Sequence, residues 1–237
     1  MSQGARVMTM RTSMLLLVSG LALVTPGAAI AQAGRTPDVT PFLIANQAEE
    51  MRLARSAAPA FISDSATVLV LGRDGFVEAA HGKNGFTCVV IRSLSGRLDD
   101  PELFNPRIRA PHCFNAPAVR TVLPTLLKQT EWVLSGARPS DIMTRIEHAY
   151  AAHTFPPPES GAMAYMLSPE QYLTDNGTHW LPHLMFFFDK SFPPAAWGAH
   201  DGGASPIVDG SAGDPHAPYL TFIIPVRKWA SGAPASM

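Results

Sequence analysis

The chain has 237 residues, of which 46% are hydrophobic and 16% are charged, and its formal net charge is −1 at pH 7. This composition is typical of a packed globular protein and excludes intrinsic disorder or a coiled coil as the main organisation. The balanced charge also excludes a surface that recruits nucleic acid electrostatically, because such a surface needs an excess of Lys and Arg.

Residues 1–31 have the pattern of a secretory signal peptide. Arg6 and Arg11 precede an apolar run at residues 15–24, and the segment ends on an Ala-Ile-Ala cleavage site. The apolar run is too short to span a bilayer comfortably, so we expect export and cleavage. The mature chain then begins with a flexible segment, residues 32–39, and contains no further run of membrane-spanning length. A periplasmic or secreted location follows.

A helix and three strands are the first elements expected in the mature chain. Thr40 and Pro41 are typical of a helix start, and the apolar spacing after them predicts an amphipathic helix over residues 40–55. Runs rich in β-branched residues then predict strands at 67–71, 76–80 and 86–91. Turns that contain Asp-Gly and Asn-Gly separate these runs, which predicts a three-stranded meander.

The second half of the chain is expected to hold a loop, two helices and three strands. The loop covers residues 94–117, the helices cover 118–134 and 140–153, and the strands cover 162–167, 183–188 and 219–226. Pro124 either starts or kinks the first of these helices. The Gly-, Pro- and Asp-rich segment 189–218 is too long for an ordinary connection, so it is either a functional or a mobile surface loop.

This order of elements predicts a single α+β domain over residues 40–229, followed by a flexible tail at residues 230–237. We expect an antiparallel sheet of about five to six strands with the helices on one face. Sensory modules of the PAS and Cache kind have a similar element order, but a shared order carries no function.

The only two cysteines are Cys88 and Cys113. In an exported protein their even number favours a disulfide between them. The alternative is a reactive Cys113 thiol beside His112. The cleavage region has no cysteine that could accept a lipid anchor.

Three histidines are the candidate metal ligands, with zinc as the cofactor they would bind. His179 and His183 are four residues apart, a spacing at which two imidazoles share zinc on one helical face. Pro182 argues against a helix there, and an extended chain would separate the two by roughly 13 Å. His112 is the one third ligand worth testing. In the alternative interpretation these are ordinary histidines with backbone partners.

Arginines gather around the loop between the two cysteines, and guanidinium groups suit carboxylate or phosphate ligands. They are Arg92, Arg97, Arg107, Arg109 and Arg120. An anion site is one interpretation, and internal neutralisation by Asp99, Asp100 and Glu102 is the other. No Gly-x-Ser-x-Gly elbow of a serine hydrolase occurs, and we assign no catalytic residue.

Four sequence blocks resemble an uncharacterised group of exported bacterial proteins. They are residues 82–90, 161–167, 182–186 and 222–226. The resemblance spans most of the mature chain. It implies a bacterial periplasmic or secreted location, and it implies no activity, cofactor or catalytic residue.

The function expected from the sequence is non-catalytic binding of a small ligand or a partner protein by an exported domain. One alternative is a metal-dependent hydrolase that uses His112, His179 and His183 to activate a water molecule. Another alternative is a structural protein of the cell envelope in which the segment 189–218 docks a partner.

Overall fold

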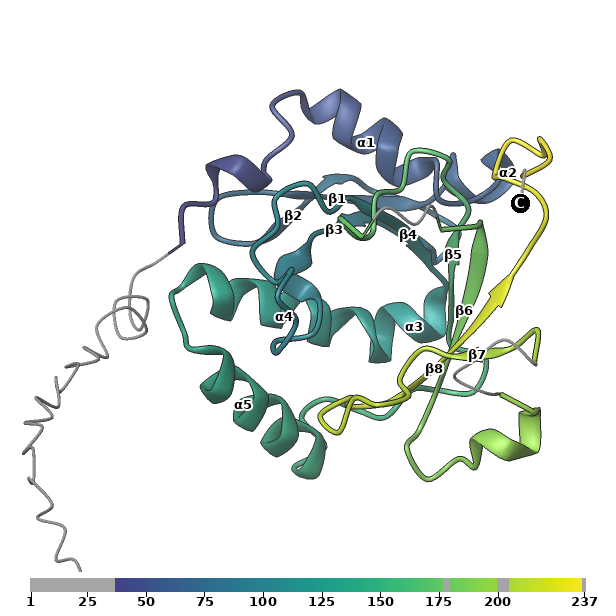
Figure 1. Ribbon diagram of the computed structural model, residues 1–237. Coiled ribbons are helices and arrows are strands. Elements are labelled where there is room, and N and C mark those ends of the chain that lie inside the picture. The colour runs from purple at the N-terminus through teal and green to yellow at the C-terminus, as the bar shows by residue number, and fades with distance from the viewer. Residues whose placement is uncertain (1–36, 177–179, 200–204, 236–237) are drawn as a thin grey trace, which may run out of the picture. The chain divides into compact units, whose positions relative to one another are not determined.

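Figure 1 presents a computed structural model of the chain, which describes residues 37–176, 180–199 and 205–235. The predicted signal peptide, residues 1–31, lies outside the described residues, and so does His179. Both therefore stay predictions. Backbone hydrogen bonds hold the chain as far as Ala235, whose N–H donates to the carbonyl of Arg227. In the described part of the chain no helix is both long and apolar enough to cross a membrane.

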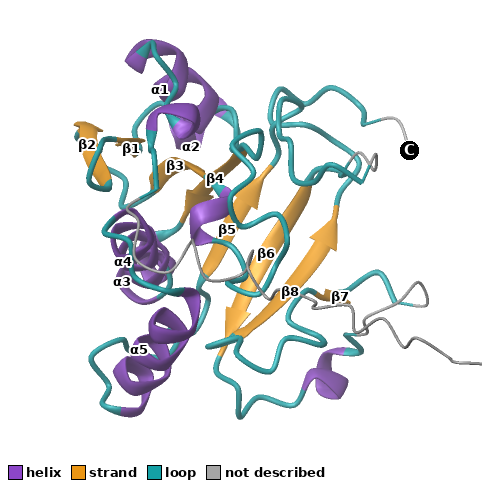
Figure 2. Ribbon diagram, turned by 60° about the vertical axis from the view of Figure 1, so that its left-hand side comes forward, coloured by secondary structure: helices purple, strands orange, loops and turns teal. Residues whose placement is uncertain are grey.

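The described residues form one sheet with helices packed against it (Figures 1 and 2). The helices are α1 (Gln47–Arg55), α2 (Ala60–Ser63), α3 (Ala116–Thr121), α4 (Leu123–Leu134) and α5 (Pro139–Ala151). The strands are β1 (Thr67–Leu71), β2 (Phe76–Ala80), β3 (Thr87–Ile91), β4 (Ala110–Phe114), β5 (Met163–Met166), β6 (His183–Phe188), β7 (Val208–Asp209) and β8 (Leu220–Pro225). Short 3-10 turns occupy Thr40–Phe42, Ser93–Ser95 and Pro194–Trp197.

The sheet has the strand order β2-β1-β3-β4-β5-β6-β8-β7, and every neighbouring pair is antiparallel except β1 and β3. The predicted α+β class and mostly antiparallel sheet are confirmed. The predicted count of five to six strands is too low, because eight occur within the described residues. The two additional strands, β4 and β7, lie in segments that the sequence predicted to be loops.

Strand β4 escaped prediction because its sequence, Ala-Pro-His-Cys-Phe, is neither alternating nor uniformly apolar. Proline also argues against a central strand, since it cannot donate to a ladder. The structure accommodates Pro111 because the β4–β5 ladder includes only Cys113 and Phe114. Pro111 therefore pairs with β3 alone, opposite Val90.

The predicted meander of β1, β2 and β3 is wrong, because β3 lies on the far side of β1 and runs parallel to it. The connection from β2 crosses the start of β1 on the way. There the Lys83 N–H donates to the Ser65 carbonyl at 2.8 Å, and a Cβ on Gly82 would lie only 2.1 Å from the Thr67 nitrogen. Glycine is needed at this crossing for close backbone approach, and the Gly-rich segment is a crossover instead of a hairpin turn.

Helices cover both faces of the sheet, which corrects the prediction that they gather on one. Helix α1 packs over β1, β3 and β4, whereas α3 and α4 lie on the opposite face, as Figure 1 shows. The reason is the burial of β3, in which all five residues are enclosed. Its alternate side chains point to opposite faces of the sheet. Cys88 and Val90 are buried on the face that α1 covers, and Val89 and Ile91 are buried on the face that α3 and α4 cover.

Two of the predicted helices are interrupted. Over residues 40–55, a 3-10 turn comes first, and α1 starts only where the Asn46 side chain accepts the Ala48 N–H at 2.9 Å. Over residues 118–134, α3 ends and α4 begins around Val122, with Pro124 in the first turn of α4. Proline is tolerated there because the first N–H groups of a helix have no intrahelical partner.

The predicted disulfide between Cys88 and Cys113 is confirmed. The two residues stand directly opposite each other on β3 and β4, with their Cα atoms 4.0 Å apart. Both side chains are fully buried beneath α1. The alternative of a reactive Cys113 thiol is therefore wrong, and His112, next in the strand, points to the opposite face.

Candidate functional site

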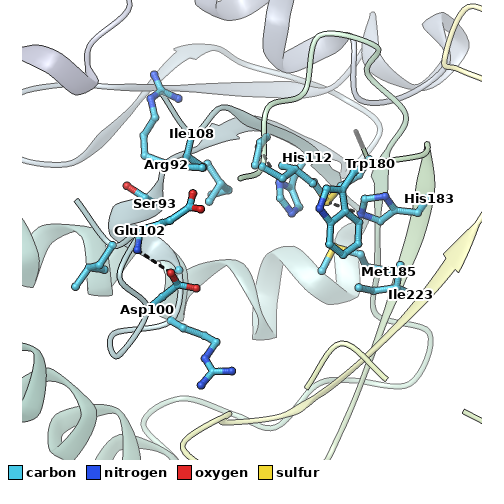
Figure 3. Close-up of a pocket in the computed structure, with 17 residues that line it drawn as sticks. Arg92, Ser93, Asp100, Glu102, Ile108, His112, Trp180, His183, Met185 and Ile223 are labelled. Carbon is cyan, nitrogen blue, oxygen red and sulfur yellow. Dashed lines mark hydrogen bonds between the residues drawn. The ribbon is translucent and has the colours of Figure 1, made fainter. Parts of the chain in front are cut away.

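A cavity of about 270 Å³ lies on the face of the sheet opposite to α1. Strands β3, β4, β5, β6 and β8 form its floor, and the segment 92–108 with Leu173 and Trp180 forms its walls. Most of the lining is apolar, but two histidine side chains from different strands also contribute to it. Figure 3 shows these two, His112 and His183, on the same side of the cavity. We call this space the imidazole cavity.

His112 is held in one protonation state by its surroundings. Its ring is buried and stacks on Phe114, with ring centroids 5.2 Å apart. Burial lowers the pKa of His112 to about 4, so the ring is neutral at pH 7. Its Nδ1 atom lies 2.8 Å from the Ala110 carbonyl oxygen, which can only accept a hydrogen bond. The single ring proton is therefore on Nδ1, and Nε2 has a free lone pair.

His183 has the same arrangement. Its side chain is buried, and its Nδ1 lies 2.8 Å from the Leu181 carbonyl oxygen. Burial again lowers the pKa, which favours the neutral ring with its proton on Nδ1. The Nε2 atom lies 3.1 Å from the Met166 sulfur. The Nε2 nitrogen and the Met166 sulfur therefore lie opposite each other, each with an unshared electron pair and with no hydrogen between them.

The strand register brings His112, Met166 and His183 into one row across the sheet. Met166 pairs with His183 in the β5–β6 ladder. In the antiparallel β4–β5 ladder, Cys113 pairs with Tyr165, so the next position along places His112 beside Met166. All three side chains line the cavity. The row therefore presents two imidazole nitrogens and a thioether sulfur from three neighbouring strands.

Met185 and Trp180 complete this side of the cavity (Figure 3). Met185 is two residues beyond His183 in β6, so its side chain lies on the same face of the sheet. The Trp180 ring centroid lies 5.7 Å from that of His183, and Trp180 is 40% exposed, which places its indole between the cavity and solvent.

Gln171 holds the segment that carries Trp180. Its buried side-chain amide donates to the carbonyl oxygens of Trp180, at 3.0 Å, and Leu181, at 3.2 Å. The Leu181 carbonyl is also the acceptor for His183 Nδ1. Gln171 therefore positions the indole and, through Leu181, the ring that carries the free lone pair.

The carboxylates of the cavity lie on the side away from the histidines, as Figure 3 shows for Asp100 and Glu102. Both already have partners within the protein. Asp100 accepts the Glu102 N–H at 2.7 Å, and Glu102 accepts the Thr174 hydroxyl at 2.8 Å and the Asp175 N–H at 3.1 Å. These acids fix the loop that closes the cavity and are not directed at the imidazole nitrogens.

The arginines of the cluster have partners within the chain, but of the three acids that the sequence offered only Asp99 takes part, in a pair with Arg97. Arg92 is fully buried and paired with Glu50 at 2.6 Å. The other arginines pair with carboxylates or donate to backbone carbonyls: Arg97 with Asp99, Arg107 with Asp175, Arg120 with Glu159, and Arg109 with the carbonyls of Pro106 and Ile108. The cluster therefore supports the fold and offers no open anion site.

A second cavity of about 310 Å³ adjoins the first and shares Gly96, Arg97, Met185 and Ile223 with it. Its histidine is His216, whose Nδ1 lies 3.0 Å from a carboxylate oxygen of Glu147. Unlike the imidazole cavity, it has no buried histidine with a free nitrogen in its described lining.

Of the three predicted metal ligands, the structure brings His112 and His183 together, and His179 is outside the described residues. No group of three His, Cys, Asp or Glu side chains suited to a metal occurs in the ranges that the structure describes. The sequence reasoning missed Met166 and Met185, because it searched only for the usual zinc ligands. No local pattern marks these two residues, because β5 has methionines three positions apart, Met163 and Met166, and β6 has only Met185.

We expect the protein to lose stability when the pH falls from 7 to 5. The folded-state pKa of His112, about 4, is below the usual value of 6.5, so in this range the unfolded chain takes up a proton that the folded chain does not. The resulting loss is about 2 kcal/mol. Urea unfolding at pH 7 and pH 5 measures it.

The matched control is His112→Asn, which stays neutral throughout and keeps an amide near the Ala110 carbonyl. Its stability should fall by about 2 kcal/mol less than that of the wild type over the same range. An identical decrease in both proteins would show that His112 is protonated equally in the folded and unfolded states.

The comparisons with known proteins leave the cavity to be interpreted from its own chemistry. No family model, curated protein or solved structure matches the chain. The PAS and Cache element order stays an analogy, and the resemblance to exported bacterial proteins stays an expectation.

Proposed function

We propose that this protein is an exported, non-catalytic binding domain that takes a small ligand into the imidazole cavity. The observation that carries the proposal is the pair of neutral, buried rings whose Nε2 lone pairs have no proton donor among the described residues. Because these lone pairs belong to rings that line a cavity, a bound ligand that brings an N–H group, an O–H group or a positive charge is the expected partner. The disulfide of the chain is compatible with a location outside the cytoplasm.

The cavity limits the ligand in size and in chemistry. A volume of about 270 Å³ is near the lower end of the usual range for small-molecule sites. The lining offers two nitrogen lone pairs and two thioether sulfurs within largely apolar walls. A suitable ligand therefore accepts electron pairs, either as a metal ion or through N–H or O–H groups on a small molecule.

The protonation states favour binding over catalysis. A general base works best when its pKa is near the operating pH, and burial places the pKa of His112 far below neutrality. The one serine hydroxyl in the lining, that of Ser93, donates to the Asn105 carbonyl at 2.9 Å and is not activated by a histidine.

The metal-dependent hydrolase is the weaker alternative. It gains from the meeting of His112 and His183 in one cavity, but a catalytic zinc site usually has three protein ligands drawn from His, Cys and carboxylates. The nearest further donors are methionine sulfurs, which are not among the usual zinc ligands. Hydrolysis of an ester or peptide panel by the zinc-loaded protein would favour this alternative.

A thermal-shift screen against small metabolites and metal ions tests the proposal. A ligand at one hundred times its Kd stabilises a folded protein by about 2.7 kcal/mol, which corresponds to roughly 5 to 10 °C for a domain of this size. The variant Ala110→Trp fills the cavity, because Ala110 lies in its lining two residues from His112. We expect at least one ligand to raise the melting temperature of the wild type and to leave that of this variant unchanged.

The matched control is Ala60→Trp, which adds the same side chain at an exposed position in α2. It should respond to the ligand as the wild type does. The proposal is contradicted if no compound shifts the wild type, or if every shift persists in Ala110→Trp.

A further inference from the structure

We infer that the ligand of the imidazole cavity is a copper(I) ion bound by His112 Nε2, His183 Nε2 and the sulfur of Met166, with Met185 as a further sulfur donor. This inference rests on the proposed function, because it names the ligand of the same cavity.

The two rings and the thioether present unshared electron pairs within one cavity. The Nδ1 atom of each ring is opposite a carbonyl oxygen, so neither Nε2 carries the proton of a neutral ring. His183 Nε2 and Met166 Sδ nevertheless lie 3.1 Å apart. Two electron-pair donors that face each other without a hydrogen gain nothing from the contact, whereas a cation bound beside both atoms, on the cavity side, is stabilised by both.

The donor atoms are of a kind that suits copper(I). Thioether sulfur is a soft ligand that selects copper(I), and imidazole is compatible with it. All four proposed donors are also uncharged. A buried site without anionic ligands holds one positive charge at a lower desolvation cost than two, which favours copper(I) over zinc. The carboxylates that would suit a harder ion, Asp100 and Glu102, lie on the other side of the cavity (Figure 3).

An indole ring lies beside the donor atoms. Trp180 lines the cavity next to His183, with part of its surface exposed to solvent. An aromatic face attracts a cation electrostatically, and a bulky side chain at the cavity mouth limits access of water. Gln171 fixes the backbone of this residue through its bond to the Trp180 carbonyl. Copper binding should therefore quench the fluorescence of Trp180.

The test is an anaerobic titration of the mature exported protein with copper(I), kept reduced by ascorbate, in competition with a chromogenic copper(I) chelator. Ascorbate is used because a thiol reductant would open the disulfide and create new copper ligands. We expect one copper ion per chain, and at least tenfold weaker binding in Met166→Leu, a substitution that preserves side-chain volume. When the titration is followed by tryptophan fluorescence, the Trp180→Phe variant should show little of the quenching seen in the wild type.

Met143→Leu is the matched control, because Met143 lies in the adjoining cavity and not among the proposed donors. It should bind copper(I) as the wild type does. X-ray absorption at the copper edge gives a second readout, with sulfur scattering expected in the wild type and diminished in Met166→Leu. Zinc should not displace the bound copper(I).

Three outcomes overturn the inference. If copper(I) binds equally well to Met166→Leu and to the wild type, the row of donors is not the site. If copper(I) does not bind but a small organic compound stabilises the wild type and not Ala110→Trp, the proposed function stands and the copper assignment fails. If neither copper(I) nor any compound acts on the wild type, both fail.

Discussion

Replacing Glu50 by Ala is expected to destabilise the protein by about 3–5 kcal/mol, because it leaves the buried Arg92 guanidinium without its counter-charge. Both side chains are almost completely enclosed, and they are joined at 2.6 Å. Glu50 also accepts the N–H of Leu71, at 3.0 Å. Burial lowers the pKa of Arg92 to about 10, so the guanidinium is still charged at pH 7. Urea unfolding measures the loss.

The double variant Glu50→Leu with Arg92→Met is the control for this prediction. Replacing a buried ion pair by apolar side chains of similar size is often nearly neutral. We therefore expect the double variant to be more stable than Glu50→Ala. If the double variant is as unstable as the single one, the loss comes from packing or from the Leu71 hydrogen bond, not from an unpaired charge.

Removing the disulfide with Cys88→Ala and Cys113→Ala is expected to cost about 3–4 kcal/mol. The bridge joins residues 25 positions apart, and closing a loop of that length restricts the unfolded chain by about this much in the chain-entropy model. The deletion of two buried sulfur atoms between α1 and the sheet adds to the loss. The free energy of unfolding in urea, without reductant, is the quantity to compare.

The wild type unfolded in the presence of a strong reductant is the matching experiment. It should approach the stability of the double alanine variant, which itself should not respond to reductant. Equal stability of the oxidised wild type and the alanine variant would mean that the cross-link makes no net contribution to stability.

Local patterns predicted most of the elements but not their neighbours in the sheet. The strands β1, β2 and β3 were located within a residue, since each is a short segment bounded by turns that contain glycine, and β1 and β3 are rich in β-branched residues. Their order was wrong because pairing is decided by the close approach of Gly82 to the start of β1, a contact that periodicity does not encode. Strand β4 was missed because tertiary pairing with β3 and β5 overrides the effect of Pro111.

The candidate site was only partly predictable for a related reason. His112 and His183 were selected because histidine is a common metal ligand. The sequence spacing between His179 and His183 is not what brings His183 close to His112. They meet because β5 lies between β4 and β6, which are more than sixty residues apart in sequence. Met166 comes from that middle strand, and no local motif links it to either histidine.

Native mass spectrometry is the most direct test of the claim that the imidazole cavity holds a ligand. The protein would be exported with its own N-terminal segment and purified without chelator or reductant. It would then be exposed to the compounds of the thermal-shift screen and, anaerobically with ascorbate, to copper(I). The account predicts that the native mass of the wild type exceeds its denatured mass by one ligand, and that Ala110→Trp lacks this excess. An excess that persists in Ala110→Trp, or no excess in either protein, would contradict it.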